Sequence, residues 1–189
     1  MKDVLNILKL GLILAAFSVV SCVSLALVNS ITAPIIAEKK MSGSAAAMRE
    51  IFPEAAKFEA VEAVASAQNG EVTFRSVNLA KSADDALLGA VVEAEGPTYD
   101  RAVILVGVDT SFAVKGTSIL ELYDSPGFGQ RAKEGGYMDQ YNGKTPDDAF
   151  VVGDDIVALS GASISSKGIA AILKAAVSEA QAVIKENSK

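Results

Sequence analysis

The sequence predicts an α+β protein: a single N-terminal transmembrane helix, followed by a domain with a mainly antiparallel sheet and packed helices. Three observations lead to this prediction. Residues 10–37 carry no charge, and residues 10–28 are almost continuously apolar. Apolar, β-branched segments then succeed one another between residues 71 and 122 without strict alternation with helices. Finally, apolar residues from Ile169 to Ile184 recur at the spacing of an amphipathic helix.

Composition limits the chemistry that the chain can support. The 189 residues have a formal net charge of −6 and show no basic stripe, so nucleic acid is not expected as a partner. The chain has no histidine and one cysteine, Cys22. This excludes Cys/His zinc sites, clusters held by a full set of thiolates, histidine-ligated haem and a Ser-His-Asp triad. If the protein does redox chemistry, the electrons must reside on an organic cofactor.

The apolar N-terminal segment is long enough to cross a membrane, since about 20 residues suffice for a helical span. A cleaved signal sequence is the alternative, because the segment ending at Cys22 loosely resembles a lipoprotein cleavage site. The apolar run continues for six residues beyond Cys22, which favours a retained helix. We therefore expect a membrane anchor in residues 1–35 and a separate domain in residues 36–189. Lysines flank the span on both sides, so the distribution of positive charge gives little indication of which end of the helix faces the cytoplasm.

The remaining elements are predicted from apolar periodicity and from turn residues. Residues 33–40 are expected to form a linker, and Pro53 is expected to separate two short helices, 45–51 and 54–64. Strands are expected at residues 71–79, 87–94, 102–108, 111–122 (with a turn at Lys115-Gly116) and 155–159, before the C-terminal helix.

The stretch between the last predicted strand and that helix is rich in small residues and hydroxyls. Gly161 and Ala162 allow close approach to the backbone, and the free N–H groups at a helix start favour an anion such as phosphate. Ser163 places a hydroxyl at that point, with Ser160 and Ser165 beside it. A serine-rich N-cap without ligand is the plainer interpretation of these residues.

A second turn motif, Asp124-Ser125-Pro126-Gly127-Phe128-Gly129, follows the strand that ends near residue 122. Pro126 presets its φ angle, and Gly127 and Gly129 permit a positive φ or the close approach of a flat ligand. Without context, an ordinary Pro-Gly turn explains these residues equally well.

Together the two motifs resemble a known family. The segment Ser160-Gly161-Ala162-Ser163, followed by Ile-Ser-Ser-Lys, is similar to the Ser-Gly-Ala-Thr-x-Thr-Ser signature of the FMN-binding domain in the G component of the Rnf electron-transport complex. The same domain occurs in the C component of the sodium-pumping NADH:quinone reductase. The earlier motif is similar to the Glu-Thr-Pro-Gly-Leu-Gly segment of that domain, and the N-terminal anchor also fits. The chain length favours the Rnf component.

The resemblance implies a cofactor and a set of binding residues. FMN would be joined through its phosphate to Ser163 by a flavin transferase that uses FAD as donor. The isoalloxazine ring would lie against residues 126–129, Phe128 among them, while Ser125 and backbone N–H groups near Gly127 would contact its polar edge. Ser165 and Ser166 are fallback acceptors. An aromatic-bearing helix is implied near residues 137–141.

The resemblance also implies a place in a larger assembly. The protein would be a single-pass component of the cytoplasmic membrane with its C-terminal domain on the outer face. It would relay electrons among the other membrane subunits of an Rnf-type complex that couples ferredoxin and NAD to the movement of sodium ions or protons. The alternatives are the quinone reductase component, a solitary extracellular flavin carrier, or an anchored binding module without redox activity.

The chain departs from the family pattern at four positions. Serine replaces threonine at Ser163, aspartate replaces glutamate at Asp124, phenylalanine replaces leucine at Phe128, and Val157 stands where the family often has aspartate. Serine has the same hydroxyl chemistry, so attachment remains the expectation. The aspartate pairs at 84–85, 147–148 and 154–155 are expected to be solvated faces or caps rather than a metal or acid–base site.

Overall fold

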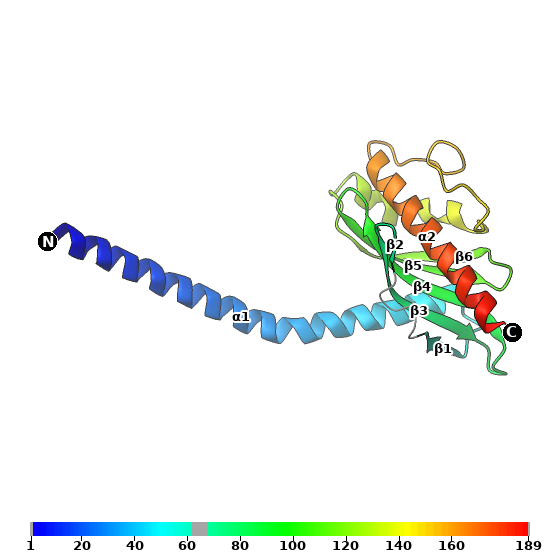
Figure 1. The fold of residues 1–189 in the computed structure, drawn as a ribbon, viewed down its shortest axis with the longest axis horizontal. Coiled ribbons are helices and arrows are strands. Elements are labelled where there is room, and N and C mark those ends of the chain that lie inside the picture. The colour runs from blue at the N-terminus through cyan, green and yellow to red at the C-terminus, as the bar shows by residue number, and fades with distance from the viewer. Residues whose placement is uncertain (1, 62–67, 189) are drawn as a thin grey trace. The chain divides into compact units, whose positions relative to one another are not determined.

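The computed structural model describes residues 2–61 and 68–188 and divides into two compact units, Met1–Ser42 and Gly43–Lys189 (Figure 1). The first unit is formed by helix α1, whose last turns belong to the second unit together with the sheet and the C-terminal helix. In chain order the elements are α1 (Lys2–Ile51), β1 (Lys57–Ala60), β2 (Gln68–Asn69), β3 (Val72–Lys81), β4 (Leu87–Pro97), β5 (Arg101–Asp109), β6 (Val114–Leu122), the 3₁₀ helices η2 (Gly129–Lys133) and η3 (Tyr137–Tyr141), and α2 (Ser163–Asn187).

Helix α1 contains a stretch that is long and apolar enough to cross a membrane, as the sequence predicts. The helix runs on through Pro34, so the expected linker at 33–40 and the separate helix at 45–51 are both wrong: these residues are part of α1. An internal proline costs a helix about 3 kcal/mol. Glutamate, lysines and alanines with high helix propensity follow it between residues 37 and 47, and they allow the helix to continue.

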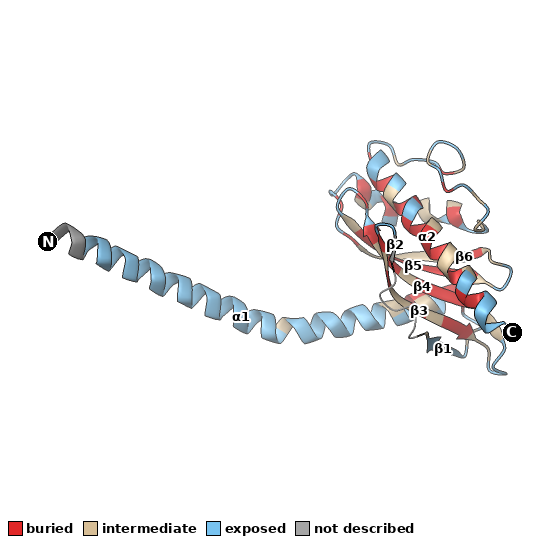
Figure 2. Ribbon diagram, viewed as in Figure 1, coloured by how far each residue is buried: buried red, intermediate tan, exposed pale blue. Residues whose placement is uncertain are grey.

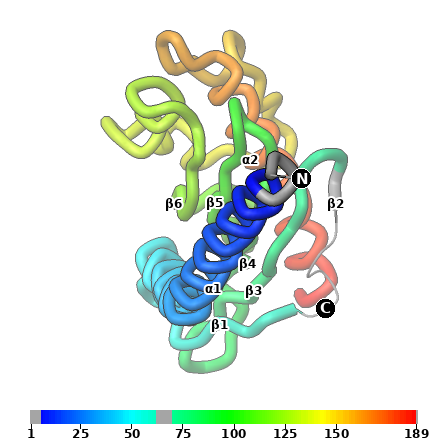
Figure 3. Tube along the Cα trace, turned by 90° about the vertical axis from the view of Figure 1, so that its left-hand side faces the viewer, coloured from blue at the N-terminus to red at the C-terminus, as the bar shows by residue number. Residues whose placement is uncertain are grey.

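The sheet is antiparallel throughout, with the strand order β1-β3-β4-β5-β6 and with β2 paired to β3 (Figure 3). The four strands predicted between residues 71 and 122 are present as β3 to β6. Strand β6, however, runs through Lys115-Gly116, where the sequence predicts a turn. The chain turns just before it instead, where the Asp109 carboxylate accepts the N–H groups of Ser111 and Ala113 at 2.8 and 3.1 Å.

The helix predicted at residues 54–64 is also wrong, because residues 57–60 form the edge strand β1; residues 62–64 lie outside the described part of the chain. Alanine-rich composition favours a helix here. The unpaired edge of β3 competes for the same backbone, and the N–H of Ala56 donates to the carbonyl of Lys81 at 2.8 Å. A cross-strand ion pair adds to the pairing, with Lys81 Nζ 2.6 Å from Glu59 Oε2. Tertiary pairing therefore outweighs local propensity.

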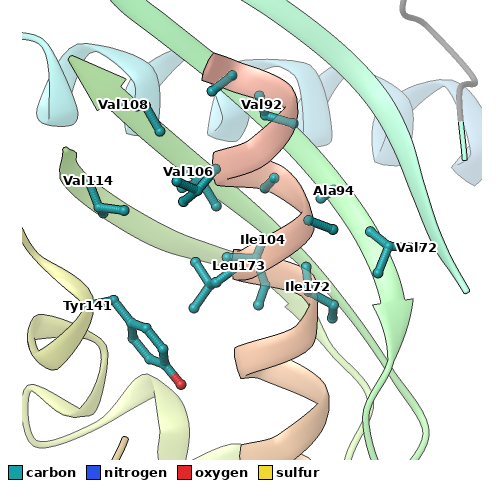
Figure 4. Close-up of a cluster of buried hydrophobic side chains, with 14 of the residues drawn as sticks. Val72, Val92, Ala94, Ile104, Val106, Val108, Val114, Tyr141, Ile172 and Leu173 are labelled. Atoms are coloured by element: carbon teal, nitrogen blue, oxygen red, sulfur yellow. The ribbon is translucent and has the colours of Figure 1, made fainter. Parts of the chain in front are cut away.

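Helix α2 covers one face of the sheet, and its buried stripe faces the strands (Figures 1 and 2). Ile172 and Leu173 are fully buried and pack with Val92, Ile104 and Val106 of the central strands (Figure 4). Because β4 and β5 alternate, their other residues point to the opposite face. The predicted C-terminal helix is thus confirmed, and together with the sheet it forms the main core of the second unit.

The opposite face of the sheet has a smaller core that includes the end of α1. Phe52, the residue after the helix, has no exposed surface, and it packs with Ile51, Val91 and Leu105. Gly107 leaves room for this contact, since a Cβ there would come within 2.3 Å of the Ile51 side chain.

The segment between β6 and α2 is irregular. The implied helix near residues 137–141 is the short 3₁₀ helix η3. The strand expected at 155–159 is wrong: only an isolated bridge joins Val152 to Ile156. Side chains, rather than a neighbouring strand, accept the backbone N–H groups of this segment. Gln140 Oε1 accepts the N–H of Val157 at 2.8 Å, and the Asp155 carboxylate accepts the N–H of Val151 at 2.6 Å.

Candidate functional site

The two motifs meet at one end of the second unit. The turn after β6 and the start of α2 form the walls of a pocket of about 460 Å³, and small-molecule sites typically have volumes of roughly 300–1,000 Å³. The pocket is lined by Tyr99, Ser125, Phe128, Gly129, Gly161, Ala162, Ser163, Ile164 and Ser165. Residues about 35 positions apart in the sequence therefore share one site.

The structure brings together seven of the ten residues that the sequence nominated: Ser125, Phe128, Gly129, Gly161, Ala162, Ser163 and Ser165. The other three, Ser160, Pro126 and Gly127, lie in the same two segments but do not line the pocket. Sequence reasoning missed Tyr99 and Ile164. Tyr99 lies in the turn between β4 and β5, just after Gly96-Pro97, and an aromatic residue at a turn between two strands is the signal that could have indicated it.

Gly129 is required by the way the turn packs against α2. A Cβ at this position would come within 2.3 Å of Asp124 Oδ2 and within 2.4 Å of Ser165 Oγ. No larger residue fits without displacing these atoms, so the turn lies directly on the first turn of the helix. Gly127 adopts a φ of +77°, which side-chain-bearing residues rarely adopt, and it completes the turn.

The start of α2 has an exposed hydroxyl and no side-chain cap. Ala162 is the N-cap residue, and no side chain accepts a hydrogen bond from the first helical N–H groups. A serine-rich N-cap therefore does not account for this segment. Ser163 is exposed at the first helical position, and Gly161, with a φ of +77°, turns the chain into it. Uncapped N–H groups beside a hydroxyl are suited to a phosphate.

The fallback acceptors have a different environment. Ser165 and Ser166 are buried, with exposed fractions of 2% and 0%. Ser166 Oγ accepts the N–H of Leu159 at 2.9 Å and donates to the carbonyl of Ala162 at 3.0 Å. Ser166 therefore fastens the incoming loop to the helix, and Ser163 is the serine of this group that solvent and another protein can reach.

Asp124 lies behind the pocket wall and is 1% exposed. Its Oδ1 accepts hydrogen bonds from the Thr98 hydroxyl at 2.5 Å and from the Asp100 N–H at 3.0 Å. Burial raises the pKa of this carboxyl, but hydrogen bonds from Ser165, Thr98 and backbone N–H groups outweigh burial and hold the pKa below its ordinary value. Asp124 is therefore ionised at neutral pH.

The shape and chemistry of the pocket fit FMN. Three apolar side chains on its rim remain well exposed: Tyr99 at 66%, Phe128 at 57% and Ile164 at 61%. Such side chains favour a flat aromatic ring, while the uncapped helix start and Ser163 favour a phosphate. A pocket of similar size, about 470 Å³, lies along α2 near Gly168 and Lys174, but it includes neither motif.

One aspartate of each pair contacts its own loop or a lysine side chain. Asp148 Oδ2 accepts from the N–H of Thr145 at 2.7 Å, and Asp155 pairs with Lys144 at 2.9 Å. Asp85 pairs with Lys57 at the surface at 2.6 Å. Across the described residues, no group of three or more carboxylates and thiols is arranged to hold a metal ion.

Comparison with known protein families gives one match in each half of the chain. Residues 1–51 match the RnfG N-terminal region, and residues 99–178 match the FMN-binding domain. The second match begins at Tyr99 and includes every residue that lines the pocket.

Two curated relatives are similar over most of their length. The G component of the Na(+)-translocating ferredoxin:NAD(+) oxidoreductase complex of Acetobacterium woodii is 33% identical over 181 residues, with 86% of each chain covered. The G component of the proton-translocating ferredoxin:NAD(+) oxidoreductase complex of Clostridium ljungdahlii is 30% identical over 169 residues, covering 85% of this chain and 84% of the relative. The crystal structure of Shewanella oneidensis NqrC has a similar fold, with a TM-score of 0.53 over 73% of this chain and 88% of that chain at 16% identity.

Proposed function

This chain belongs to the RnfG family, the G components of ion-translocating ferredoxin:NAD⁺ oxidoreductase (Rnf) complexes, and we propose that it carries FMN covalently on Ser163 and relays electrons within such a complex. The observation that carries the proposal is the position of Ser163. Its hydroxyl is exposed at the uncapped start of a 25-residue helix and lines a pocket with an apolar rim. A phosphate joined to this oxygen lies where the free N–H groups of the helix stabilise negative charge.

Attachment requires a donor and a leaving group. Ser163 Oγ forms a bond to the phosphorus of the FMN half of FAD, the pyrophosphate bond breaks, and AMP leaves while the hydroxyl proton passes to a base of the transferase. The chain itself has no histidine that could act as this base, and Ser163 is exposed. We therefore assign the activation of the hydroxyl to a separate flavin transferase, which needs the acceptor to be exposed.

The remaining pocket residues hold and tune the cofactor. When bound, FMN supplies reversible electron transfer. Phe128, Tyr99 and Ile164 provide apolar surface for the ring, and Ser125 offers a hydroxyl to a polar edge. The close packing at Gly129 brings both walls within reach of one ligand.

The apolar helix α1 indicates a single membrane anchor. We infer that residues 1–35 hold the protein in the cytoplasmic membrane and that the domain of residues 36–189 faces outward. Electrons would pass between this flavin and cofactors of partner membrane subunits, so that the ferredoxin:NAD⁺ activity and the ion movement belong to the assembled complex.

The experiment is a search for covalent flavin on the full chain, produced in its own membrane with a flavin transferase present. Denatured protein is run on a gel under ultraviolet light, and the fluorescent band is mapped by peptide mass spectrometry. FMN on the peptide that contains Ser163 supports the proposal. Ser163→Ala should give a dark band, and Ser163→Thr, which keeps the hydroxyl, should remain fluorescent. A dark wild-type band would favour an anchored binding module, and fluorescence of the Ser163→Ala band would contradict the acceptor assignment.

A further inference from the structure

Asp124 connects three segments of the chain at the back of the pocket. We propose that Asp124 is a positioning residue that ties the two pocket walls together and whose buried negative charge lowers the reduction potential of the flavin. This inference rests on the proposed function, because it requires FMN in the pocket. It concerns a residue that does not itself line the pocket.

The first part of the proposal follows from the contacts of the carboxylate. Oδ1 binds the hydroxyl of Thr98 and the N–H of Asp100, both in the turn between β4 and β5. Oδ2 lies on the other side, where it and Ser165 Oγ each approach the same point above Gly129, at 2.3 and 2.4 Å. The Ser165 hydroxyl also helps to lower the pKa of this carboxyl, so the carboxylate interacts with both the strand turn and the first turn of α2.

Each neighbour of Asp124 carries part of the pocket. Thr98 precedes Tyr99, Asp124 precedes Ser125, and Ser165 and Gly129 line the pocket themselves. A shift of the carboxylate would move the rim, the turn and the helix start relative to one another. This is why the bridge acts on the cofactor without touching it.

The second part follows from the charge. Its low pKa keeps Asp124 ionised, and the partners that stabilise it within the described residues are hydrogen-bond donors without formal charge. The nearby cation Arg101 is bound elsewhere, to Glu95 at 2.7 Å. Oδ2 faces the uncharged Ser165 hydroxyl, so no cation of the described residues pairs with the carboxylate. Buried charges act over longer distances than exposed ones, because little water screens them.

Two-electron reduction of a flavin with uptake of one proton adds a negative charge to the ring. A fixed carboxylate behind the pocket wall opposes this gain, and thus lowers the potential. The size of this effect depends on the net charge at residue 124, while the shape of the pocket depends on its hydrogen bonds. The two contributions can be separated by substitution.

The test is spectroelectrochemical titration of the covalently loaded, detergent-purified full chain. Asp124→Asn keeps the shape of the side chain but removes the charge, and its midpoint potential should shift to more positive values. Asp124→Glu retains the charge and should stay nearer to wild type than Asp124→Asn does. Thr98→Val removes a hydrogen bond that disperses the charge, so its potential should shift in the negative direction.

Opposite shifts of Asp124→Asn and Thr98→Val support the inference, because a general loosening of the pocket would move both potentials in the same direction. An unchanged potential in fully loaded Asp124→Asn, or shifts of equal sign in the two variants, would overturn it. If Asp124→Asn does not fold, the midpoint potential of Thr98→Val is compared with that of wild type: a negative shift supports the inference, and a positive shift or none overturns it. A wild-type protein without flavin contradicts the proposed function instead, and the two failures are thereby distinguished.

Discussion

Gly168 of α2 lies directly on the carbonyl of Pro97, the last residue of β4: a Cβ at Gly168 would be only 2.4 Å from Pro97 O. Gly96 makes the reciprocal contact one residue earlier, where a Cβ would lie 2.6 Å from Ile172. The helix that opens at Ser163 is thus seated against the strand turn that carries Thr98 and Tyr99. Gly96 and Gly168 allow the short distance between α2 and this end of β4.

Gly168→Ala should destabilise the protein by roughly 1–3 kcal/mol, the usual cost of overpacking a tight contact. Alanine is the better helix former by about 1 kcal/mol, so a loss of stability would show that the contact outweighs propensity. Urea unfolding followed by circular dichroism measures the change. Lys167→Ala, at the exposed neighbouring position, is the control and should shift stability by no more than about 0.5 kcal/mol. A Gly168→Ala protein as stable as wild type would show that α2 can move away.

Ser166→Ala should cost about 1–3 kcal/mol, because it leaves the N–H of Leu159 without its partner inside the protein. Ser163→Ala should leave stability nearly unchanged, since that side chain is exposed. The same pair of variants tests attachment: FMN should be lost from Ser163→Ala without appearing on Ser165 or Ser166, as both are buried. Peptide mass spectrometry that finds FMN on either buried serine would contradict this.

Asp155 should make stability depend on pH in the acid range. The hydrogen bond from Lys144, helped by the N–H groups of Val151 and Phe150 and opposed by burial, lowers the pKa of Asp155 to about 2. An unfolded aspartate has a pKa of about 3.9, so the folded state is stabilised above that value, and this stabilisation is lost as pH falls from there through about 2.

Asp155→Asn should therefore be less stable than wild type at pH 7, and the difference in unfolding free energy should shrink between about pH 4 and pH 2. Unfolding by urea over that range measures it. Asp154→Asn controls for the loss of one negative charge at an exposed neighbour. A difference that stays constant down to pH 2 would mean that the ion pair with Lys144 is not maintained in solution.

Phe128→Ala should leave the fold intact, because the side chain is 57% exposed, but it should uncover one side of the bound ring. Quenching of flavin fluorescence by iodide should increase, while covalent loading persists. Tyr123→Ala is a matched change of an exposed aromatic residue outside the pocket, and it should leave quenching as in wild type. Equal quenching in Phe128→Ala and wild type would place the ring elsewhere.

The central strands and α2 could be predicted because their patterns are locally complete. Apolar runs at residues 87–94 and 102–108 suit strands that are buried on both faces, and Ile169 to Ile184 follow one helical stripe. The secondary-structure predictions are wrong where contacts with residues distant in the sequence determine the local structure. Residues 57–60 have helix-favouring neighbours but pair with the edge of β3, and residues 155–159 look like a strand but find side-chain partners instead.

In the site, too, local sequence patterns could be recognised and features that depend on tertiary packing could not. The two motifs were recognisable because glycine, proline and hydroxyl residues stand at short, fixed spacing. Tyr99 and Ile164 were not, since nothing in their neighbours links them to a pocket that forms only when β4, β6 and α2 come together. The burial that separates Ser165 and Ser166 from Ser163 is likewise a property of packing, which no local pattern contains.

Ile51 and Phe52 complete the smaller core beneath the sheet, although they close the same helix that supplies the apolar span. A protease that cut before Gly43 would therefore release a fragment that keeps this core complete, whereas a cut after Pro53 would remove Ile51 and Phe52 from the sheet. Exchanging this anchor for another by gene fusion has the same limit. The splice must fall upstream of residue 43, inside the helix rather than at its end.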